Sequence, residues 1–166
     1  MRGPLLNIAL HQPEIPNNTG NIGRTCVAMG CALHLIHPLG FDISEKACRR
    51  AGLDYWPRLD LHEHDTFDAY RGSVGPGASV WALTTRAERS LFDATIRPGD
   101  HLLLGSETRG LPDAVLQRDP EHCVFLPMVA GERSLNVATV MCAAASEGIR
   151  QMIGRGDLRL DPNGRL

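Results

Sequence analysis

Short apolar runs alternate with helix-like segments along this 166-residue chain. Residues 5–11 form a β-type run, residues 20–29 fit a helix, and residues 32–37 form the next apolar run. A strand, a helix and a second strand in this order make a βαβ unit, in which the two strands lie parallel. The alternation continues with three more apolar runs and a final helix. The sequence therefore predicts an α/β domain built on a parallel sheet.

Turn and capping residues set the expected limits of these elements. Asn18 or Thr19 is expected to cap the first helix, and Gly30 is expected to end it. Asp42 and Glu45 resemble a capping box at the start of another helix. The other expected bounds are Asp42 to about Ala51 for that helix, Leu5–His11, Ala32–His37, Ser79–Thr84, His101–Gly105 and Cys123–Pro127 for strands, a short helix from Pro112, and a last helix from Ser134 or Leu135 to Ile153, ended by Gly154.

The composition is that of an ordinary globular protein, with 43% hydrophobic and 22% charged residues. We expect one domain over residues 1–156 and a polar C-terminal tail, residues 157–166, that frays. No apolar run approaches the ~20 residues that span a bilayer, so we expect no membrane partner. The first four residues, Met1 to Pro4, lack the apolar stretch of a signal peptide, which predicts a cytoplasmic protein.

The cysteine, histidine and lysine residues do not by themselves indicate a catalytic or metal-binding function. The cysteines contain no Cys-x-x-Cys pair and the histidines no ligand spacing, so we expect no metal site. His62 and His64 are expected at surface positions. Lys46 is the only lysine, and the remaining basic residues are arginines, which suit forked contacts to phosphate. The net charge of −2 does not attract nucleic acid to the whole molecule, so composition leaves RNA binding undecided.

Residues 17–24 form the first of three polar segments that carry more chemistry than a turn needs. A capped helix start would explain Asn18, but it does not explain Asn21, Gly23 and Arg24 together. Glycine is a poor helix former and has no capping role at this place. It permits close approach of another backbone, and Arg24 would lie one turn into the helix, facing whatever the segment binds.

The second polar segment follows the apolar run that begins at His101. Gly105 and Gly110 bracket a loop that contains Glu107 and Arg109, which could bind a ligand or pair with each other. The segment is neither the Gly-x-Gly-x-x-Gly of a dinucleotide fold nor a phosphate-binding Gly-Lys-Ser loop, and both patterns are absent from the whole sequence.

The third polar segment, residues 126–136, leads from the last strand candidate into the last helix. Capping of that helix explains Ser134 but not Arg133 and Asn136, since asparagine is a mediocre choice for a first turn unless its amide is used. The helix that follows is rich in small residues, which favour either a dimer contact or a tight contact within the chain. These small residues are Ala138, Ala143, Ala144, Ala145 and Ser146.

The three segments contain Asn-Thr-Gly-Asn-Ile-Gly-Arg at 18–24, Gly-Ser-Glu-Thr-Arg-Gly-Leu-Pro at 105–112, and Leu-Pro-Met at 126–128 with Ser-Leu-Asn at 134–136. In this order they resemble the three signature motifs of the SPOUT class of RNA methyltransferases. The resemblance also takes in residues 12–16 and 49–55, so it spans nearly the whole chain. These additional matches point to the smallest members, of TrmL type, which methylate the ribose 2′-hydroxyl of the tRNA wobble nucleotide, a cytidine or a uridine.

The resemblance implies a parallel-sheet α/β domain whose C-terminal segment forms a deep trefoil knot, with S-adenosyl-L-methionine as the cofactor and tRNA as the partner. It also implies a homodimer that shares each active site between subunits through the first and last helices. The implied catalytic residues are Arg24, Ser134 and Asn136; the cofactor-binding residues are Leu83, Gly105, Glu107, Gly110, Leu126, Met128 and Ser134; and the RNA-binding residues are Asn18, Arg24, Arg50, Arg109 and Arg133.

Two departures from the family pattern bear on RNA contacts rather than on the cofactor. Ala138 stands where members often have a polar residue, and Ser146 stands where close relatives tend to have an aromatic one. The alternatives are a nucleotide-dependent oxidoreductase, a non-catalytic RNA-binding protein of the same fold, and a methyltransferase of another RNA position. The sequence leaves open which tRNAs are substrates and whether cytidine or uridine is preferred.

Overall fold

A seven-stranded sheet forms the centre of the computed structural model, which describes residues 3–44 and 52–166. The strands lie in the order β3-β2-β1-β6-β4-β7-β5, and each neighbouring pair is parallel. The parallel α/β sheet predicted from the sequence is therefore confirmed. The strands are β1 (Asn7–His11), β2 (Ala32–Ile36), β3 (Leu61–His64), β4 (Val80–Leu83), β5 (Arg89–Ser90), β6 (His101–Leu104) and β7 (Cys123–Phe125).

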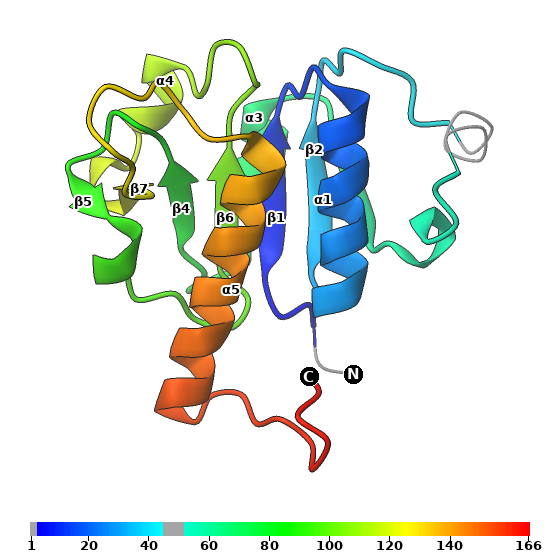
Figure 1. The fold of residues 1–166 in the computed structure, drawn as a ribbon. Helices are drawn as coiled ribbons and strands as arrows, with labels where there is room; N and C mark the ends of the chain where they lie inside the picture. Colours follow the sequence, from blue (N-terminus) through cyan, green and yellow to red (C-terminus); the bar gives the residue numbers. More distant parts are fainter. Residues whose placement is uncertain (1–2, 45–51) are drawn as a thin grey trace.

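Helices cover both faces of this sheet, as the burial of its central strands requires. All residues of β2, β4 and β6 are buried, which is typical of parallel strands packed on two sides. Two long helices lie side by side on one face, and a shorter one lies on the other (Figure 1). The long helices are α1 (Pro16–Met29) and α5 (Val137–Arg155); the shorter elements are α3 (Phe67–Ser73), α4 (Asp113–Leu116), η1 (Trp56–Arg58), η2 (Leu91–Asp93) and η3 (Pro120–His122).

Alternate side chains of each strand supply the two halves of the core. In β1, Ile8 and Leu10 belong to the cluster that includes Ile22 of α1 and residues of α5. Ala9 points to the opposite face, where it joins the cluster around Tyr70 of α3. This two-residue period fixes the register of the strand, since a slip by one residue would exchange the two sets.

Helix α1 begins earlier than expected. The predicted start near Gly20 is wrong, because the helix runs from Pro16 with Ile15 at the N-cap position. Proline suits the first helical position, since its missing N–H would have no partner there. Asn18 and Thr19 therefore lie inside the helix and do not cap it. Gly30 ends α1 in the left-handed conformation, as predicted.

Helix α5 is capped by Asn136, not by Ser134. The Oδ1 atom of Asn136 accepts hydrogen bonds from the backbone N–H groups of Ala138 and Thr139, at 2.9 and 3.3 Å. The helix ends at Gly156 (φ 79°) rather than at Gly154. Some of its small residues serve a contact within the chain: Ala144, Ala145 and Gly148 are buried, and a Cβ at Gly148 would lie 3.1 Å from Ile96, whereas Ser146 is exposed.

Two other regions differ from the sequence-based expectation. His62 and His64 lie on edge strand β3, but only His62 is exposed; the ring of His64 pairs with that of buried His34, at 3.0 Å. The helix expected from Asp42 to Ala51 lies mostly outside the described residues, and residues 42–44 are not helical. The Asp42 carboxylate instead accepts hydrogen bonds from the N–H and hydroxyl groups of Ser44.

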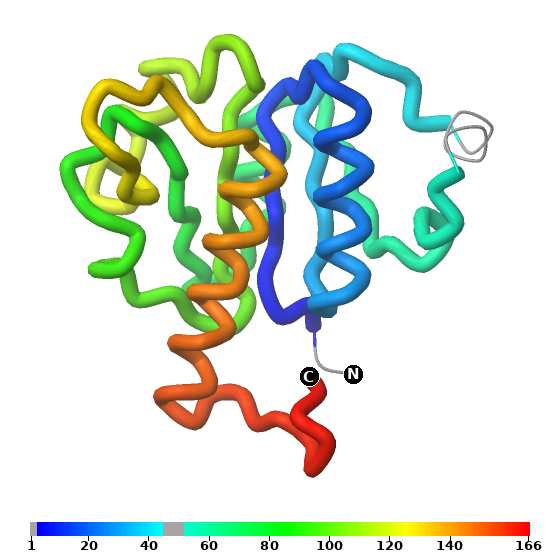
Figure 2. Tube along the Cα trace, viewed as in Figure 1, coloured from blue at the N-terminus to red at the C-terminus, as the bar shows by residue number. Residues whose placement is uncertain are grey.

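The chain crosses the carboxyl edge of the sheet after β7. Residues 126–136 run from β7, near one side of the sheet, to the start of α5 beside β1 and β6 (Figure 2). The polar segments after β1, β6 and β7 consequently meet at this edge, where ligands bind in open α/β sheets. After α5 the chain turns back, and Leu158 packs against the core.

Candidate active site

A pocket of about 570 Å³ lies at the carboxyl edge of the sheet, within the range of small-molecule sites. Its walls come from the ends of β4 and β6, the segment after β7, and the first turns of α1 and α5. Almost all of the predicted site residues line it. They are Asn18, Leu83, Gly105, Glu107, Arg109, Gly110, Leu126, Met128, Arg133, Ser134 and Asn136.

The loop after β6 folds back tightly on itself. A Cβ added to Gly105 would lie 2.1 Å from the carbonyl carbon of Gly110, so no larger residue fits at this position. Gly110 has a φ of 67°, and its N–H donates to the carbonyl oxygen of Ser106 at 2.8 Å. Both glycines are therefore required by backbone geometry, which explains the two glycines that bracket this segment in the sequence.

The carboxylate of Glu107 lies at the N-terminus of α1. It accepts hydrogen bonds from the backbone N–H groups of Glu14 (2.8 Å) and Ile15 (3.3 Å). The N-cap residue, Ile15, has no side-chain hydrogen bond of its own, and the helix dipole favours a negative charge here. Glu107 therefore serves as a cap supplied from a distant loop, which fastens that loop to α1.

Asn18 connects Glu107 to the start of α5. Its Nδ2 atom donates to Glu107 Oε1 at 3.0 Å, while its Oδ1 atom accepts from Asn136 Nδ2, also at 3.0 Å. Asn18 is buried, whereas Glu107 is half-buried and Asn136 is exposed, so the two hydrogen bonds are partly accessible to water. One residue from each of the three polar segments thus enters a single chain of hydrogen bonds along the pocket wall.

Glu14 forms a second link between the start of α1 and the loop after β6. Its carboxylate accepts from the hydroxyl (2.7 Å) and the N–H (3.2 Å) of Thr108, and it lies 3.5 Å from Arg109. The hydrogen bonds from Thr108, more than the charge of Arg109, lower the pKa of Glu14. Sequence reasoning assigned Glu14 no role, although it lies in the Gln-Pro-Glu-Ile-Pro stretch that carries part of the resemblance.

Arg86 is a second site residue that the sequence did not reveal. Its guanidinium donates to the carbonyl oxygen of Leu111 and to the carboxylate of Asp113, so it holds the end of the 105–110 loop against α4. Arg86 also lines the pocket. No pattern around Arg86 distinguishes it from the other arginines of the chain, because its partners are 25 and 27 residues away.

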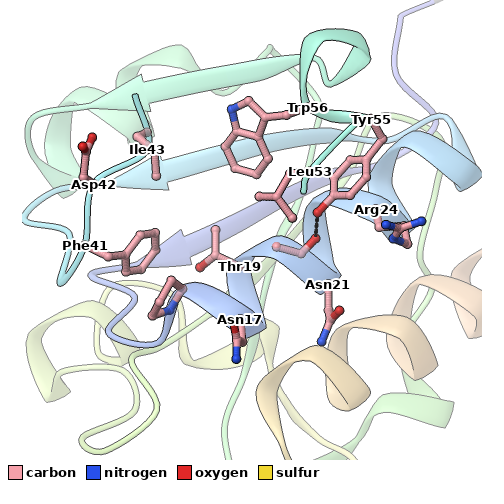
Figure 3. Close-up of a pocket in the computed structure, with 12 residues that line it drawn as sticks. Asn17, Thr19, Asn21, Arg24, Phe41, Asp42, Ile43, Leu53, Tyr55 and Trp56 are labelled. Atoms are coloured by element: carbon pink, nitrogen blue, oxygen red, sulfur yellow. Dashed lines mark hydrogen bonds between the residues drawn. The ribbon is translucent and has the colours of Figure 1, made fainter. Parts of the chain in front are cut away.

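Arg24 is placed differently from the other predicted catalytic residues. It lines a second pocket together with Asn17, Asn21 and Tyr55, and it is absent from the lining of the first (Figure 3). Its side chain is 63% exposed, lies 3.8 Å from Asp54 and covers the Tyr55 ring at 4.7 Å. Within one chain, Ser134 and Asn136 therefore share a pocket that Arg24 does not enter.

The remaining predicted site residue, Arg50, lies outside the described residues. Within residues 3–44 and 52–166, no group of three or more His, Cys, Asp or Glu side chains is arranged to hold a metal ion. In the same part of the chain, no helix has the length and apolar character needed to cross a membrane.

Sequence comparison assigns this geometry to a family. Residues 5–145 match the SpoU rRNA Methylase family. A protein of Burkholderia ambifaria named tRNA (cytidine(34)-2′-O)-methyltransferase is 44% identical over 149 residues, which is 89% of this chain and 96% of that protein. A protein of the same name from Saccharophagus degradans is 40% identical over 149 residues, with the same coverage of both chains.

Solved structures give the same relationship. One, described as giving structural insights into the 2-OH methylation of C/U34 on tRNA, has a TM-score of 0.84 and 50% identity, covering 90% of this chain and 97% of that one. The SpoU methyltransferase AviRb from Streptomyces viridochromogenes, solved with AdoMet, has a TM-score of 0.74 and 25% identity, covering 92% of this chain and 60% of that one. The chain therefore belongs to the SpoU rRNA methylase family.

Proposed function

We propose that this protein transfers a methyl group from S-adenosyl-L-methionine to the ribose 2′-hydroxyl of the wobble nucleotide of tRNA, a cytidine or a modified uridine. The observation that carries the proposal is the convergence of residues from all three polar segments on one pocket. The relatives of 40–44% identity bear names for this reaction at cytidine 34. Because tRNA is the substrate, we place the enzyme in the cytoplasm.

The pocket suits an amphipathic cofactor. Leu83, Leu126 and Met128 offer apolar contact for an adenine ring, while the backbone of the 105–110 loop can approach closely because both of its ends are glycine. Glu107 and Asn136 bring carboxylate and amide groups to the same pocket. S-Adenosyl-L-methionine would supply a methyl group activated by a sulfonium, because in-line displacement at that methyl group releases a neutral thioether.

The residues of the chain orient the acceptor and handle its proton. A free guanidinium keeps its proton in proteins, so Arg24 cannot act as the base. We assign it the orientation of the 2′-hydroxyl and the stabilisation of the negative charge that develops on it. The proton leaves to a phosphate, or to Ser134, whose hydroxyl is exposed in the cofactor pocket and would pass its own proton on to water. Asn136, held by Asn18, fixes the segment that carries Ser134.

This division of roles needs a homodimer, because Arg24 and Ser134 of one chain line different pockets. The outer faces of α1 and α5 offer a surface for it. The exposed stripe of α1 contains Asn17, Asn21 and Arg24, and beside it α5 exposes small residues, Cys142 and Ser146 among them (Figure 1). A partner packed on these helices could bring its Arg24 to the first chain's cofactor pocket.

The strand order supports the knotted C-terminal segment that the family implies. β7 lies between β4 and β5, while β6 lies on the other side of β4. The connection from β5 to β6 therefore crosses the positions of β7 and β4, and β7 is later inserted between β4 and β5. A strand inserted through an earlier loop is rare among folds, and here it would hold the 126–136 segment rigidly against the cofactor pocket.

Nucleoside mass spectrometry of tRNA before and after incubation with the enzyme and S-adenosyl-L-methionine tests the proposal. We expect 2′-O-methylcytidine or a 2′-O-methylated uridine derivative to appear, and ribonuclease fragments should place it at the wobble position. RNA binding without any methylated product would instead favour a non-catalytic RNA-binding protein of the same fold. A methyl group at another place would identify a methyltransferase of a different RNA position.

A further inference from the structure

A second pocket, of about 340 Å³, opens between the first turns of α1 and the segments around residues 41–43 and 53–56 (Figure 3). It lies on the other side of α1 from the cofactor pocket. Asn18 faces the cofactor pocket, whereas its neighbours Asn17 and Thr19 line the second one. The mechanism proposed above uses none of these groups except Arg24, so the purpose of this pocket is unassigned.

Aromatic rings form much of the pocket wall. Phe41, Tyr55 and Trp56 line it, from the segments around residues 41–43 and 53–56. The Tyr55 hydroxyl donates to the carbonyl oxygen of Gly20, which fixes that ring against α1. Phe41 is half-buried and belongs to neither core cluster of the described chain, so core packing does not account for its position. Flat aromatic walls of this kind favour a flat ligand.

The pocket also has polar groups that could read a ligand edge. Asn17 and Asn21 lie one helical turn apart on the exposed face of α1, and each amide offers a donor and an acceptor. Thr19 is only 1% exposed, yet its hydroxyl has no hydrogen-bond partner among the described residues. In Figure 3 this hydroxyl lies on the side of Thr19 that faces Phe41. A buried hydroxyl without a partner is costly, and a ligand that bonds to it would remove that cost.

Arg24 lies at the edge of the same pocket. Its guanidinium covers one face of the Tyr55 ring and is largely exposed, so it remains available to a ribose or a phosphate. A ribose held at Arg24 would lie beside the Tyr55 ring, which belongs to the aromatic wall of the same pocket. Proteins recognise unpaired RNA bases by this combination, in which aromatic rings stack on the base and amide or hydroxyl groups bond to its edges.

We propose that the second pocket binds the unpaired base of the nucleotide whose ribose is methylated, with Phe41 stacking on the base and Thr19 bonding to its edge. The inference rests on the proposed function, because it takes RNA to be the substrate. It adds a base-binding site on the subunit that supplies Arg24. The cofactor would then be held by one subunit and the target base by its partner.

The first test compares two anticodon stem-loop RNAs that differ only in the target base, one intact and one with a ribose that lacks its base. Phe41→Ala should weaken binding of the intact RNA by about 10-fold, the effect of losing one stacked ring, and should leave binding of the RNA without the base unchanged. Phe41→Tyr should bind both RNAs like the wild type. Phe92→Ala is the matched control, since Phe92 is a 58% exposed phenylalanine outside the pocket.

Thr19→Val provides a second test, in which melting temperature and RNA affinity should change in opposite senses. A damaged fold would lower both. The change removes the hydroxyl and keeps the shape, so the free protein should melt about 2–4 °C higher. Binding of the intact RNA should nevertheless weaken by about 3- to 10-fold. A more stable protein with weaker RNA binding supports the proposal, and unchanged binding contradicts it.

The outcomes separate this inference from the proposed function. A wild-type enzyme that methylates tRNA while Phe41→Ala weakens both RNAs equally overturns the base pocket and leaves the function intact. A wild-type enzyme without methylation overturns the function, and the binding comparison still decides whether the pocket holds a base. If Phe41→Ala changes only the oligomeric state in size-exclusion chromatography, the pocket is a contact between copies of the chain and the proposal is wrong.

Discussion

The side-chain amide of Asn136 donates to Oδ1 of Asn18 over 3.0 Å, and this contact joins the N-terminal ends of the two long helices. Asn18 passes the connection to Glu107 in the loop after β6. Each residue is thus fixed by the next, and all three line the cofactor pocket. The shape of that pocket therefore depends on side chains whose partners are 89 and 118 residues apart in the sequence.

Asn18→Asp should weaken binding of S-adenosyl-L-methionine by about 10-fold or more. The substitution removes the donor to Glu107 and places a second carboxylate beside it in a buried position, which costs more than the loss of one hydrogen bond. Isothermal titration calorimetry measures the effect. Asn163→Asp, an exposed position in the C-terminal tail, is the control and should bind like the wild type. Equal affinity of Asn18→Asp and the control would show that the network does not support the pocket.

Two substitutions at Asn136 should separate its two tasks. Asn136→Ala removes the cap of α5 and should lower the free energy of unfolding by about 1 kcal/mol. Asn136→Asp keeps an oxygen for the cap and loses the donor to Asn18, so it should melt near the wild-type temperature but bind the cofactor more weakly. Thermal melting and calorimetry together check this. If both variants lost the same stability and the same affinity, the two tasks would not be separable.

Gly105→Ala should prevent the loop after β6 from closing. The added methyl group would meet the backbone of Gly110 at 2.1 Å, and backbone atoms cannot swing aside as the end of a flexible side chain can. We expect loss of cofactor binding and a drop of about 1–3 kcal/mol in the free energy of unfolding. The matched control is Gly72→Ala in α3, where a Cβ would have nothing within 4 Å. A Gly105→Ala enzyme with normal cofactor affinity would contradict this account.

Local patterns predicted the central strands and the two long helices, but not β5 or α3, and they did not identify β3 as a strand. The buried runs at β1, β2, β4, β6 and β7 are apolar enough to be found by composition. Gly30 predicted the end of α1 because glycine readily adopts the left-handed backbone that ends this helix. The predicted N-terminal limits of α1 and α5 were wrong because the local sequence did not show which residue caps each helix. Asn18 and Ser134 look like caps, but a distant residue, Glu107, serves one helix and Asn136 serves the other.

The site was predictable as a set of residues but not as a geometry. Each family motif is a short continuous stretch of sequence, so the resemblance could name its residues one by one. Almost all of these residues line one pocket in the structure. Glu14 and Arg86 were missed, since their roles arise from contacts with Thr108 and Leu111 that no local pattern encodes. The separation of Arg24 from Ser134 was also invisible in the sequence, because it depends on which side of α1 each group faces.

The histidine cluster on the α3 face of the sheet should make stability fall in acid. Burial lowers the pKa of His34 to about 3 and that of His101 to about 4, from 6.5 in the unfolded chain. The folded protein therefore binds fewer protons than the unfolded chain below pH 6.5. Stability is fully present above that pH and is lost progressively as the pH falls toward 4 and 3, by up to about 1.4 kcal/mol per pH unit for each histidine.

Chemical denaturation between pH 7 and 4 measures this slope. His34→Gln keeps a polar group near Asn7 and His64 but cannot be protonated in this range, so its stability should fall less steeply than that of the wild type. His122→Gln, which changes a half-buried histidine outside the cluster, serves as the control and should leave the contribution of the cluster in place. Parallel slopes for His34→Gln and the wild type would show that His34 does not titrate with unfolding.

Mixed dimers should reveal whether each active site is shared between two subunits. Arg24→Ala and Asn136→Ala should each be nearly inactive, because each damages both sites of its own homodimer. In a mixed dimer, one site combines the intact Arg24 of one subunit with the intact cofactor pocket of the other. Random reassociation makes half of the dimers mixed, so the mixture should recover about one quarter of the wild-type activity. Asn18→Asp mixed with Asn136→Ala should recover none, since both changes damage the cofactor pocket, and a first mixture that also stayed inactive would show that Arg24 acts within its own subunit.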